Sequence, residues 1–366
     1  MIITLEKKEF GEAVASVGKF AERKSATLPV LAGIAIVAGD DGIKLRATNL
    51  ETGIDLKVKG TIKTQGVVAL PATTLKEMTS SFSGSGEITL EHTGDTVIVS
   101  SSTGRSTLKT LSYDDFPTLP YPDAPTTRFT ISGAVLRALI GTVGPCASPS
   151  MVRPELASVL LALESGVLKC VATDSFRLCE KKVSIPGNLP DFSLLIPAKN
   201  ALDIVSTIPD EPIEMLIDEH QCAFSWKNGL LTTRLVTANY PDYKQIIPKA
   251  FVSEAVVLKK DLESAIRRTA IFADSFQKVR IGLDPAAKQV TLAARNSDVG
   301  ESSEKIPASV TGESVELSFN HRYLQAPLSA ITADSLTLSA SGIGRPLVIK
   351  GSGDTSYLYL VMPMNQ

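Results

Sequence analysis

The sequence predicts an α+β protein built from three similar domains. One observation is a motif that recurs at a period of about 120 residues, which indicates an internal repeat. In each copy an apolar strand ends at a polar turn that begins with Asn49, Asp174 or Asn296. Asn and Asp suit this place because their side chains bond to the backbone of a tight turn. A second observation is that every repeat has the same order of patterns: helix, strands, helix, strands.

Length and composition are those of a globular protein. The 366 residues suffice for two or three domains, and 43% hydrophobic and 21% charged residues are ordinary for a chain with buried cores. A formal net charge of −2 argues against a strongly basic nucleic-acid binder, but does not say where the cations lie. No apolar run reaches the length of a membrane span, and the N-terminus lacks the pattern of a signal peptide, so we expect a cytoplasmic protein.

The cysteines predict no metal or redox site. Their spacing is not that of paired ligands, and most lie in apolar stretches, so we expect reduced and mostly buried thiols. They are Cys146, Cys170, Cys179 and Cys222.

The first repeat, residues 1–121, opens with an amphipathic helix between Leu5 and Phe20, where Phe10, Val14 and Val17 recur at helical spacing. A second helix is predicted from Pro71 onward. Strands are predicted at 28–37, up to Asn49, and at 52–59, 66–70, 87–91, 96–101 and 105–111.

The other two repeats follow the same order. In residues 127–248 we expect a short strand at 128–131, a helix at 132–143, strands at 157–163 and from 168, and a helix after Pro197. In residues 254–366 the first helix centres on Leu262 and Ile266, and the second begins near Asn320, a good cap. Pro327 lacks a backbone donor, so this second helix should be kinked or start late. With helices segregated to one face, we expect three domains joined edge to edge.

No pattern of catalysis is evident. His92, His220 and His321 lie beside strands or turns without the context of a nucleophile and its base. The Gly-x-Gly stretches at 84–86 and 351–353 do not open a helix after a strand, as a phosphate loop would. The aspartates sit at turns without metal-site spacing. We therefore expect a binding protein that is not an enzyme and uses no cofactor.

Cations on the predicted helices suggest a first binding surface. If the repeat places all helices on one side, they would attract duplex DNA without reading its sequence. The alternative is that each cation is an ordinary solvated residue. The residues are Lys7, Lys8, Lys19, Lys76, Arg137, Lys199, Arg267, Arg268 and Arg322.

A second possible surface is apolar. Phe176 and Leu178 lie at the turn of the second repeat, and Met362 and Met364 lie near the C-terminus. Methionines can form an adaptable binding surface. The alternative is that these are ordinary core and tail residues. Matching edges at both ends of a three-domain chain also favour head-to-tail association, which closes into a ring or runs on as a filament.

Several motifs together resemble the bacterial DNA polymerase III beta subunit, the family of sliding clamps, over the full chain. The resemblance rests on their order and spacing. The motifs are Thr27–Leu31, Arg153–Leu156, Ala172–Leu178, Asn239–Tyr243, Ser318–Tyr323 and Val361–Met364.

The resemblance implies three repeated DNA-clamp domains, at 1–121, 127–248 and 254–366, each with two helices packed on antiparallel sheets. Two chains would assemble as a head-to-tail dimeric ring, a homodimer around double-stranded DNA that raises the processivity of a polymerase. Implied partners are the DNA polymerase III alpha subunit, the clamp loader and other proteins with a clamp-binding motif. The alternative is a three-repeat interaction scaffold that kept the fold and does not encircle DNA.

The resemblance also implies roles for individual residues. DNA contacts map to Arg23, Lys24, Arg137, Arg153 and Lys199. The dimer contact maps to Leu108 of one chain against Ile271 and Phe272 of the other. A cleft for partner peptides maps to Leu156, Thr173, Ser175, Phe176, Arg177, Leu178, Pro241, Gln245, Ile246, Asn320, Tyr323, Val361, Met362, Pro363 and Met364.

The chain departs from the family pattern at some of these positions. The family usually has Gly, then His or Tyr, where this chain has Ser175 and Phe176, and often has Arg where Gln245 stands. It often ends in Arg-Leu where this chain has Asn365 and Gln366. We expect these changes to alter one wall of the cleft and its preference for partner peptides.

Overall fold

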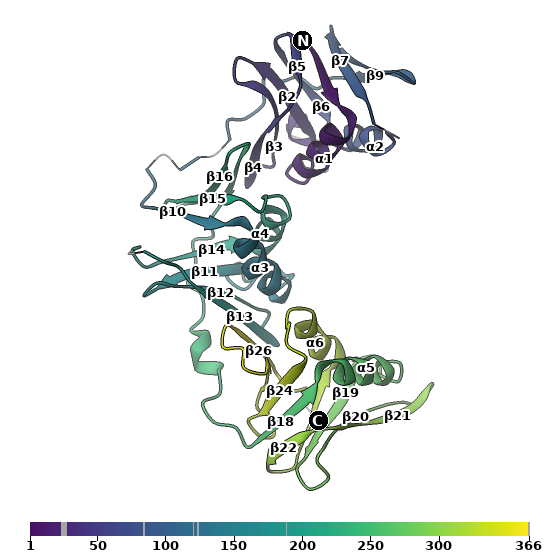
Figure 1. Cartoon of the computed structure of the whole chain (residues 1–366), viewed down its shortest axis with the longest axis vertical. Helices are drawn as coiled ribbons and strands as arrows, with labels where there is room; N and C mark the ends of the chain where they lie inside the picture. Colours follow the sequence, from purple (N-terminus) through teal and green to yellow (C-terminus); the bar gives the residue numbers. More distant parts are fainter. Residues whose placement is uncertain (23–27, 83–84, 120, 123, 188, 365–366) are drawn as a thin grey trace. The chain divides into compact units, whose positions relative to one another are not determined.

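The computed structural model describes residues 1–366 except 23–27, 83–84, 120, 123, 188 and 365–366 (Figure 1). Contacts divide the chain into two compact units. The first unit comprises Met1–Arg137 and Lys199–Thr237, and the second comprises Ala138–Ala198 and Ala238–Gln366. Each unit contains two complete antiparallel sheets.

In the first unit, one sheet has five strands and the other has eight. The five-stranded sheet has the order β5 (Thr61–Thr64), β1 (Ile2–Glu6), β7 (Glu87–Thr93), β8 (Thr96–Ser101) and β9 (Gly104–Lys109). The eight-stranded sheet has the order β10 (Thr127–Ser132), β15 (Pro212–Ile217), β16 (Gln221–Trp226), β17 (Gly229–Arg234), β4 (Thr52–Val58), β3 (Gly42–Thr48), β2 (Gly33–Gly39) and β6 (Gly66–Pro71). Because β17 pairs with β4, the first two repeats share one sheet.

The second unit has a nine-stranded and a four-stranded sheet. The larger has the order β14 (Phe192–Pro197), β11 (Ser158–Glu164), β12 (Val167–Thr173), β13 (Arg177–Ser184), β26 (Tyr357–Val361), β25 (Leu347–Gly351), β24 (Ser335–Ala340), β18 (Ser253–Leu258) and β22 (Ser309–Gly312). The smaller has the order β21 (Gly300–Pro307), β20 (Gln289–Asn296), β19 (Lys278–Asp284) and β23 (Val315–Asn320). Here β13 pairs with β26, so the second and third repeats also share a sheet, as the prediction of edge-to-edge domains requires.

Six α-helices occur in the part of the chain that the structure describes, two in each repeat. They are α1 (Lys7–Val17), α2 (Ala72–Ser80), α3 (Gly133–Val143), α4 (Ala198–Val205), α5 (Lys259–Ala270) and α6 (His321–Gln325). The predicted apolar faces are buried, with Phe10, Val14 and Val17 of α1 in the core and Leu262 and Ile266 of α5 likewise. Burying such a face supplies most of the stability of a short helix.

Pro327 interrupts the second helix of the third repeat, as predicted. The α-helix ends at Gln325, and Ala326–Ser329 continue as one turn of 3₁₀ helix. Proline suits this place because its missing N–H falls at the start of the new turn, where no partner is needed.

The repeated polar turn is confirmed by equivalent hydrogen bonds. The Asn49 Oδ1 atom accepts from the N–H of Glu51 at 3.0 Å, and Asp174 Oδ1 accepts from Phe176 at 2.9 Å. Asn296 Oδ1 accepts from the N–H two residues on, at 2.9 Å. The three side chains therefore shape the same turn in all three repeats.

Some elements differ from the sequence-based expectation. Strands β1 and β5 were not predicted, although β1 lies between β5 and β7 in its sheet. The strand expected from Leu28 begins only at Gly33, because Pro29–Ala32 form a 3₁₀ helix. The four cysteines are free and buried, as expected. None of the helices in the described ranges is long and apolar enough to cross a membrane.

Candidate functional site

The turn between β12 and β13 is held by one carboxylate. Asp174 Oδ1 accepts from the backbone N–H groups of Phe176, at 2.9 Å, and Arg177, at 3.0 Å. Its Oδ2 atom accepts from Arg177 Nε at 2.9 Å. Ser175, between them, has a φ of 76°, a left-handed conformation that is unfavourable for a residue with a Cβ atom. The turn leaves Phe176 61% exposed.

Arg177 connects this turn to two other segments. Its Nη2 atom donates to the carbonyl oxygen of Pro145 at 2.8 Å. Its guanidinium carbon lies 4.8 Å from the centre of the Tyr323 ring, a cation–π contact. The side chain of Arg177 is only 17% exposed, so these contacts form largely out of water. Burial raises the pKa of Tyr323, so this ring stays neutral beside the cation.

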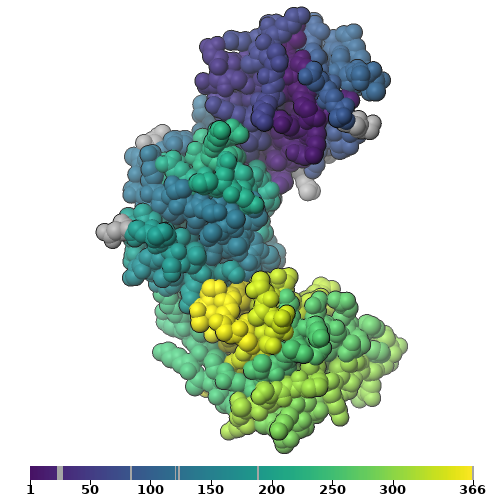
Figure 2. Space-filling model, in the orientation of Figure 1, coloured from purple at the N-terminus to yellow at the C-terminus, as the bar shows by residue number. Residues whose placement is uncertain are grey.

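The C-terminal segment lies against the same turn. Val361 pairs with Arg177 at the end of the β13–β26 ladder. Beyond it, the N–H of Met362 donates to the Phe176 carbonyl at 2.8 Å, and the N–H of Met364 donates to the Ser318 carbonyl at 2.7 Å. This C-terminal tail, residues 362–364, therefore bridges the β12–β13 turn and β23 with its side chains half-exposed. Figure 2 shows the last part of the chain, in yellow, at the surface.

Tyr323 and Asn320 come from α6 and its cap. The Asn320 side chain accepts from the N–H of Arg322 at 2.9 Å, which fixes the start of the helix. The Tyr359 hydroxyl donates to the Tyr323 carbonyl at 2.8 Å and ties α6 to β26. Several of the predicted cleft residues are thus joined by hydrogen bonds, strand pairing or ring contact. They are Phe176, Arg177, Tyr323, Val361 and Met362.

The remaining predicted cleft residues lie in the same unit. Leu156 and Leu178 are buried, Thr173 donates its hydroxyl to the Arg177 carbonyl, and Pro363 is half-exposed. Gln245 and Ile246 belong to a 3₁₀ turn, Tyr243–Ile246, that follows Pro241. Gln245 donates to Asp242 at 3.0 Å, and Ile246 is 46% exposed.

Two contacts at this site were not predicted from the sequence. The Pro145 carbonyl accepts a hydrogen bond from Arg177, and the Tyr359 hydroxyl donates one to the Tyr323 carbonyl. Neither has a local signal, because each joins residues more than 30 positions apart in the chain. A tyrosine in an apolar strand, such as Tyr359, does indicate that its hydroxyl will find a hydrogen-bond partner once it is buried, but not which one.

The predicted DNA-contacting cations differ in their availability. Arg23 and Lys24 lie outside the described residues. Lys199 is exposed on α4. Arg153 is 58% exposed, and its Nε atom lies 2.9 Å from Glu155 Oε1.

Arg137 is less available than the sequence suggested. Its guanidinium binds the carbonyls of Val205 and Ile208 and the carboxylate of Asp210. It therefore caps the carboxyl end of α4, a common place for arginine. A cation satisfied in this way has few donors left for phosphate.

The predicted dimer residues are partly exposed. Leu108 is half-exposed on β9, an edge strand of its sheet. Ile271, just after α5, is 66% exposed, and Phe272 beside it is half-exposed. No cluster of three or more metal-binding side chains occurs among the described residues.

Comparison with known proteins gives consistent matches over the whole chain. Family models of the DNA polymerase III beta subunit match at residues 1–120 for the N-terminal domain, 130–242 for the central domain and 244–365 for the C-terminal domain. The beta sliding clamp of Synechococcus elongatus is 30% identical over 345 residues, 92% of each chain. That of Bacillus subtilis is 28% identical over 381 residues, 100% of this chain and 99% of its own.

Solved structures agree. The DNA polymerase sliding clamp of Bacillus subtilis superposes with a TM-score of 0.91 at 27% identity, over 100% of this chain and 99% of that one. The DNA polymerase III beta chain of Streptococcus pneumoniae gives a TM-score of 0.92 at 25% identity, with both chains fully covered.

Three α+β repeats joined through shared sheets define a DNA clamp. The chain belongs to the DNA polymerase III beta subunit family. Its function is that of a DNA sliding clamp, a non-catalytic accessory subunit, which confirms the expectation that it is not an enzyme.

Proposed function

We propose that two copies of this chain close head to tail into a ring that encircles duplex DNA and tethers DNA polymerase III to it. The observation that carries the proposal is the full-length match to sliding clamps, with three repeats joined through the β4–β17 and β13–β26 pairs. We place the repeats at 1–121, 127–248 and 254–366. A clamp works in the cytoplasm, on the chromosome.

The ring requires a contact between a first and a third repeat. We assign this contact to Leu108 on one chain and to Ile271 and Phe272 on the other. In support, β9 and β21 are edge strands of their sheets, and an edge strand presents unpaired backbone groups that can extend a sheet. Ile271 is an exposed apolar side chain that dimerisation would bury.

Analytical ultracentrifugation tests the dimer. We expect Ile271→Asp to shift the protein to monomers, because the carboxylate would be buried in the contact. Ile343→Asp is the matched control, since Ile343 is 75% exposed and lies in the β24–β25 loop. If both variants remain dimers, this assignment of the contact is wrong.

DNA would be held by cations that neutralise backbone phosphates without reading bases. We assign this role to Arg153 and Lys199, and to Arg23 and Lys24 by family resemblance, with Arg137 serving mainly to cap α4. The test is retention on nicked circular DNA after loading by a clamp loader, with the same DNA linearised as the comparison. We expect retention on circles and rapid loss from linear ends.

The double variant Arg153→Ala, Lys199→Ala separates DNA retention from dimer formation. We expect it to remain a dimer and to leave the circle faster at low salt, by an amount that shrinks as salt is raised, because salt weakens the same phosphate contacts in the unmodified protein. Equal retention on circular and linear DNA by the unmodified protein would instead favour the scaffold that does not encircle DNA. The comparisons give that alternative no support.

Partner proteins would dock where the β12–β13 turn, α6 and the C-terminal tail meet. Phe176, Tyr323 and Met362 supply apolar surface, and the tail supplies backbone groups beside it. We expect truncation after Val361 to abolish binding of a peptide with a clamp-binding motif while the dimer persists. Unchanged peptide affinity after this truncation would remove the cleft assignment.

A further inference from the structure

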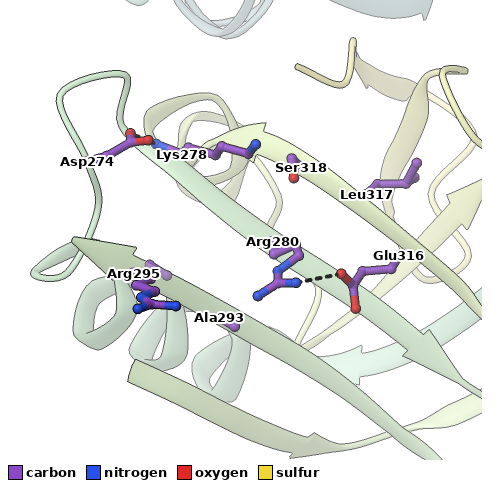
Figure 3. A pocket seen from close by; sticks show the side chains of 9 residues that line it. Asp274, Lys278, Arg280, Ala293, Arg295, Glu316, Leu317 and Ser318 are labelled. Carbon is purple, nitrogen blue, oxygen red and sulfur yellow. Dashed lines mark hydrogen bonds and ion pairs between the residues drawn. The ribbon is translucent and has the colours of Figure 1, made fainter. Parts of the chain in front are cut away.

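The exposed face of the four-stranded sheet carries a hollow of about 470 Å³ (Figure 3). Its walls come from β19, β20 and β23. Alternation along the strands places Lys278, Arg280 and Arg295 on this face, while Val279 and Ile281 point into the core. The small side chains of Ala293 and Ser318, which also line the hollow, leave room between the longer ones.

The cations of the hollow are only partly neutralised. Arg280 Nη1 lies 3.0 Å from Glu316 Oε1, and Figure 3 shows these two side chains pointing toward one another. The Asp274 carboxylate also lines the hollow, but its Oδ1 atom accepts from the backbone N–H groups of Phe276 and Lys278. Within the described ranges, the Lys278 and Arg295 side chains have no ion pair or hydrogen bond.

These two cations lie on neighbouring strands, Lys278 in β19 and Arg295 in β20, and Figure 3 shows them at separate places along the hollow. The β19–β20 ladder ends at the pair Arg280–Ala293, and Lys278 and Arg295 lie two residues beyond it on their strands. Glu301 stands opposite Arg295 on the other side, in β21, yet makes no ion pair with it in the described structure. Separate carboxylates from a bound segment could therefore pair with each of the two cations.

The hollow adjoins the C-terminal tail at Ser318. Ser318 lines the hollow, and its carbonyl oxygen accepts from the N–H of Met364 in the C-terminal tail. Asn320, two residues further along β23, caps the helix that carries Tyr323. A peptide bound against the tail therefore needs only a few more residues to reach Lys278 and Arg295.

We propose that this hollow is a second docking site, at which Lys278, Arg280 and Arg295 bind an acidic segment that flanks the clamp-binding motif of a partner protein. The proposal rests on the proposed function of the neighbouring cleft. Short carboxylate side chains match the hollow better than a nucleic-acid backbone does. Glu316 and Asp274 in its wall would repel a continuous row of phosphates, whereas separate carboxylates can settle beside the cations.

The test measures the affinity of labelled peptides for the full-length protein. The core peptide carries the clamp-binding motif of a bacterial DNA polymerase III alpha subunit. Extended forms add three Glu or three Gln residues, on either side of the motif. Proteins compared are the unmodified chain, Lys278→Ser with Arg295→Ser, and the control Lys288→Ser, whose cation lies at the opposite, closed end of the β19–β20 hairpin.

We expect Glu on one side of the motif to tighten binding roughly 3- to 10-fold relative to Gln at low salt. The gain should fall below about 2-fold in the double variant and at high salt, where partly exposed charges are screened. Lys288→Ser should keep the full gain. Unchanged affinity of the core peptide for all three proteins shows that the variants are folded.

The results separate this proposal from the cleft. If the core peptide binds and Glu gives the same gain in the double variant, the hollow is not the acidic site. If only Glu-extended peptides bind and the gain depends on Lys278 and Arg295, the acidic site in the hollow is supported and the cleft assignment is wrong. Failure of every peptide overturns both. Displacement of the Glu extension by a single-stranded oligonucleotide, in the unmodified protein alone, would assign the hollow to nucleic acid.

Discussion

Replacing Arg177 by Ala should destabilise the region around the β12–β13 turn without unfolding the protein. The change removes three contacts at once: the bond to the Asp174 carboxylate, the bond to the Pro145 carbonyl and the cation–π contact with Tyr323. The Asp174 side chain, only 8% exposed, would keep its backbone N–H partners but lose its counter-charge.

The size of the effect follows from this geometry. Removing one partner of a fully buried ion pair costs about 3–5 kcal/mol. Here the pair is partly exposed and Asp174 keeps two backbone hydrogen bonds, so we expect a loss of about 2–3 kcal/mol in local unfolding free energy. Arg177→Lys should lose less local unfolding free energy than Arg177→Ala. Lysine keeps the positive charge but cannot donate to Asp174 and Pro145 in one plane, as the guanidinium does.

Hydrogen exchange of the amides in residues 173–184 measures this local free energy. The matched control is Arg128→Ala, because Arg128 is 61% exposed and lies 3.5 Å from Glu214. Such a surface pair should contribute less than about 1 kcal/mol. Equal and small effects of the two substitutions would refute the idea that Arg177 organises the site.

Further predictions concern single side chains. Ser175→Gly should raise the unfolding free energy by about 0.5–1 kcal/mol. Glycine removes the steric strain of the Cβ atom at φ 76°, and this gain outweighs the added freedom of the unfolded chain. A lower denaturation midpoint would contradict this. Tyr243→Phe should lose about 1.5–2 kcal/mol in urea unfolding, since its hydroxyl donates to the Glu180 carboxylate at 2.6 Å. Burial and then Arg322 hold the pKa of His321 below its usual 6.5, so the unfolded chain binds the proton more readily and stability should fall as pH drops below about 6.5. His321→Gln should flatten that fall in thermal melts between about pH 5 and 7.

The repeat was the part of the fold that sequence could predict. Asn49, Asp174 and Asn296 mark the same turn because the turn is local, and a side chain bonding two residues ahead leaves a readable signal. The amphipathic helices were predictable for the same reason. Strand β5 has four residues, and Ile62 is the one apolar residue among them. This short polar stretch gives no strand pattern, so its place beside β1 depends on distant partners.

At the site, sequence could not predict contacts between residues that are far apart in the chain. Resemblance brought Arg177, Tyr323 and Met362 together, but not the Pro145 carbonyl that receives the guanidinium. Arg137 looked like a free cation on a helix, because nothing near it in the sequence is a carboxylate. Its partners are the end of α4 and Asp210, about 70 residues away.

The two shared sheets have a consequence for how the protein folds. Arg177 pairs with Val361, and Thr52 pairs with Thr233, so each joint closes a span of about 180 residues. Most other strand pairs are hairpins between neighbours, which form within microseconds. We therefore expect both joints to be late events of refolding, limited by the search of long chain segments for one another. Once formed, they consist of main-chain hydrogen bonds, whose geometry does not depend on side-chain identity.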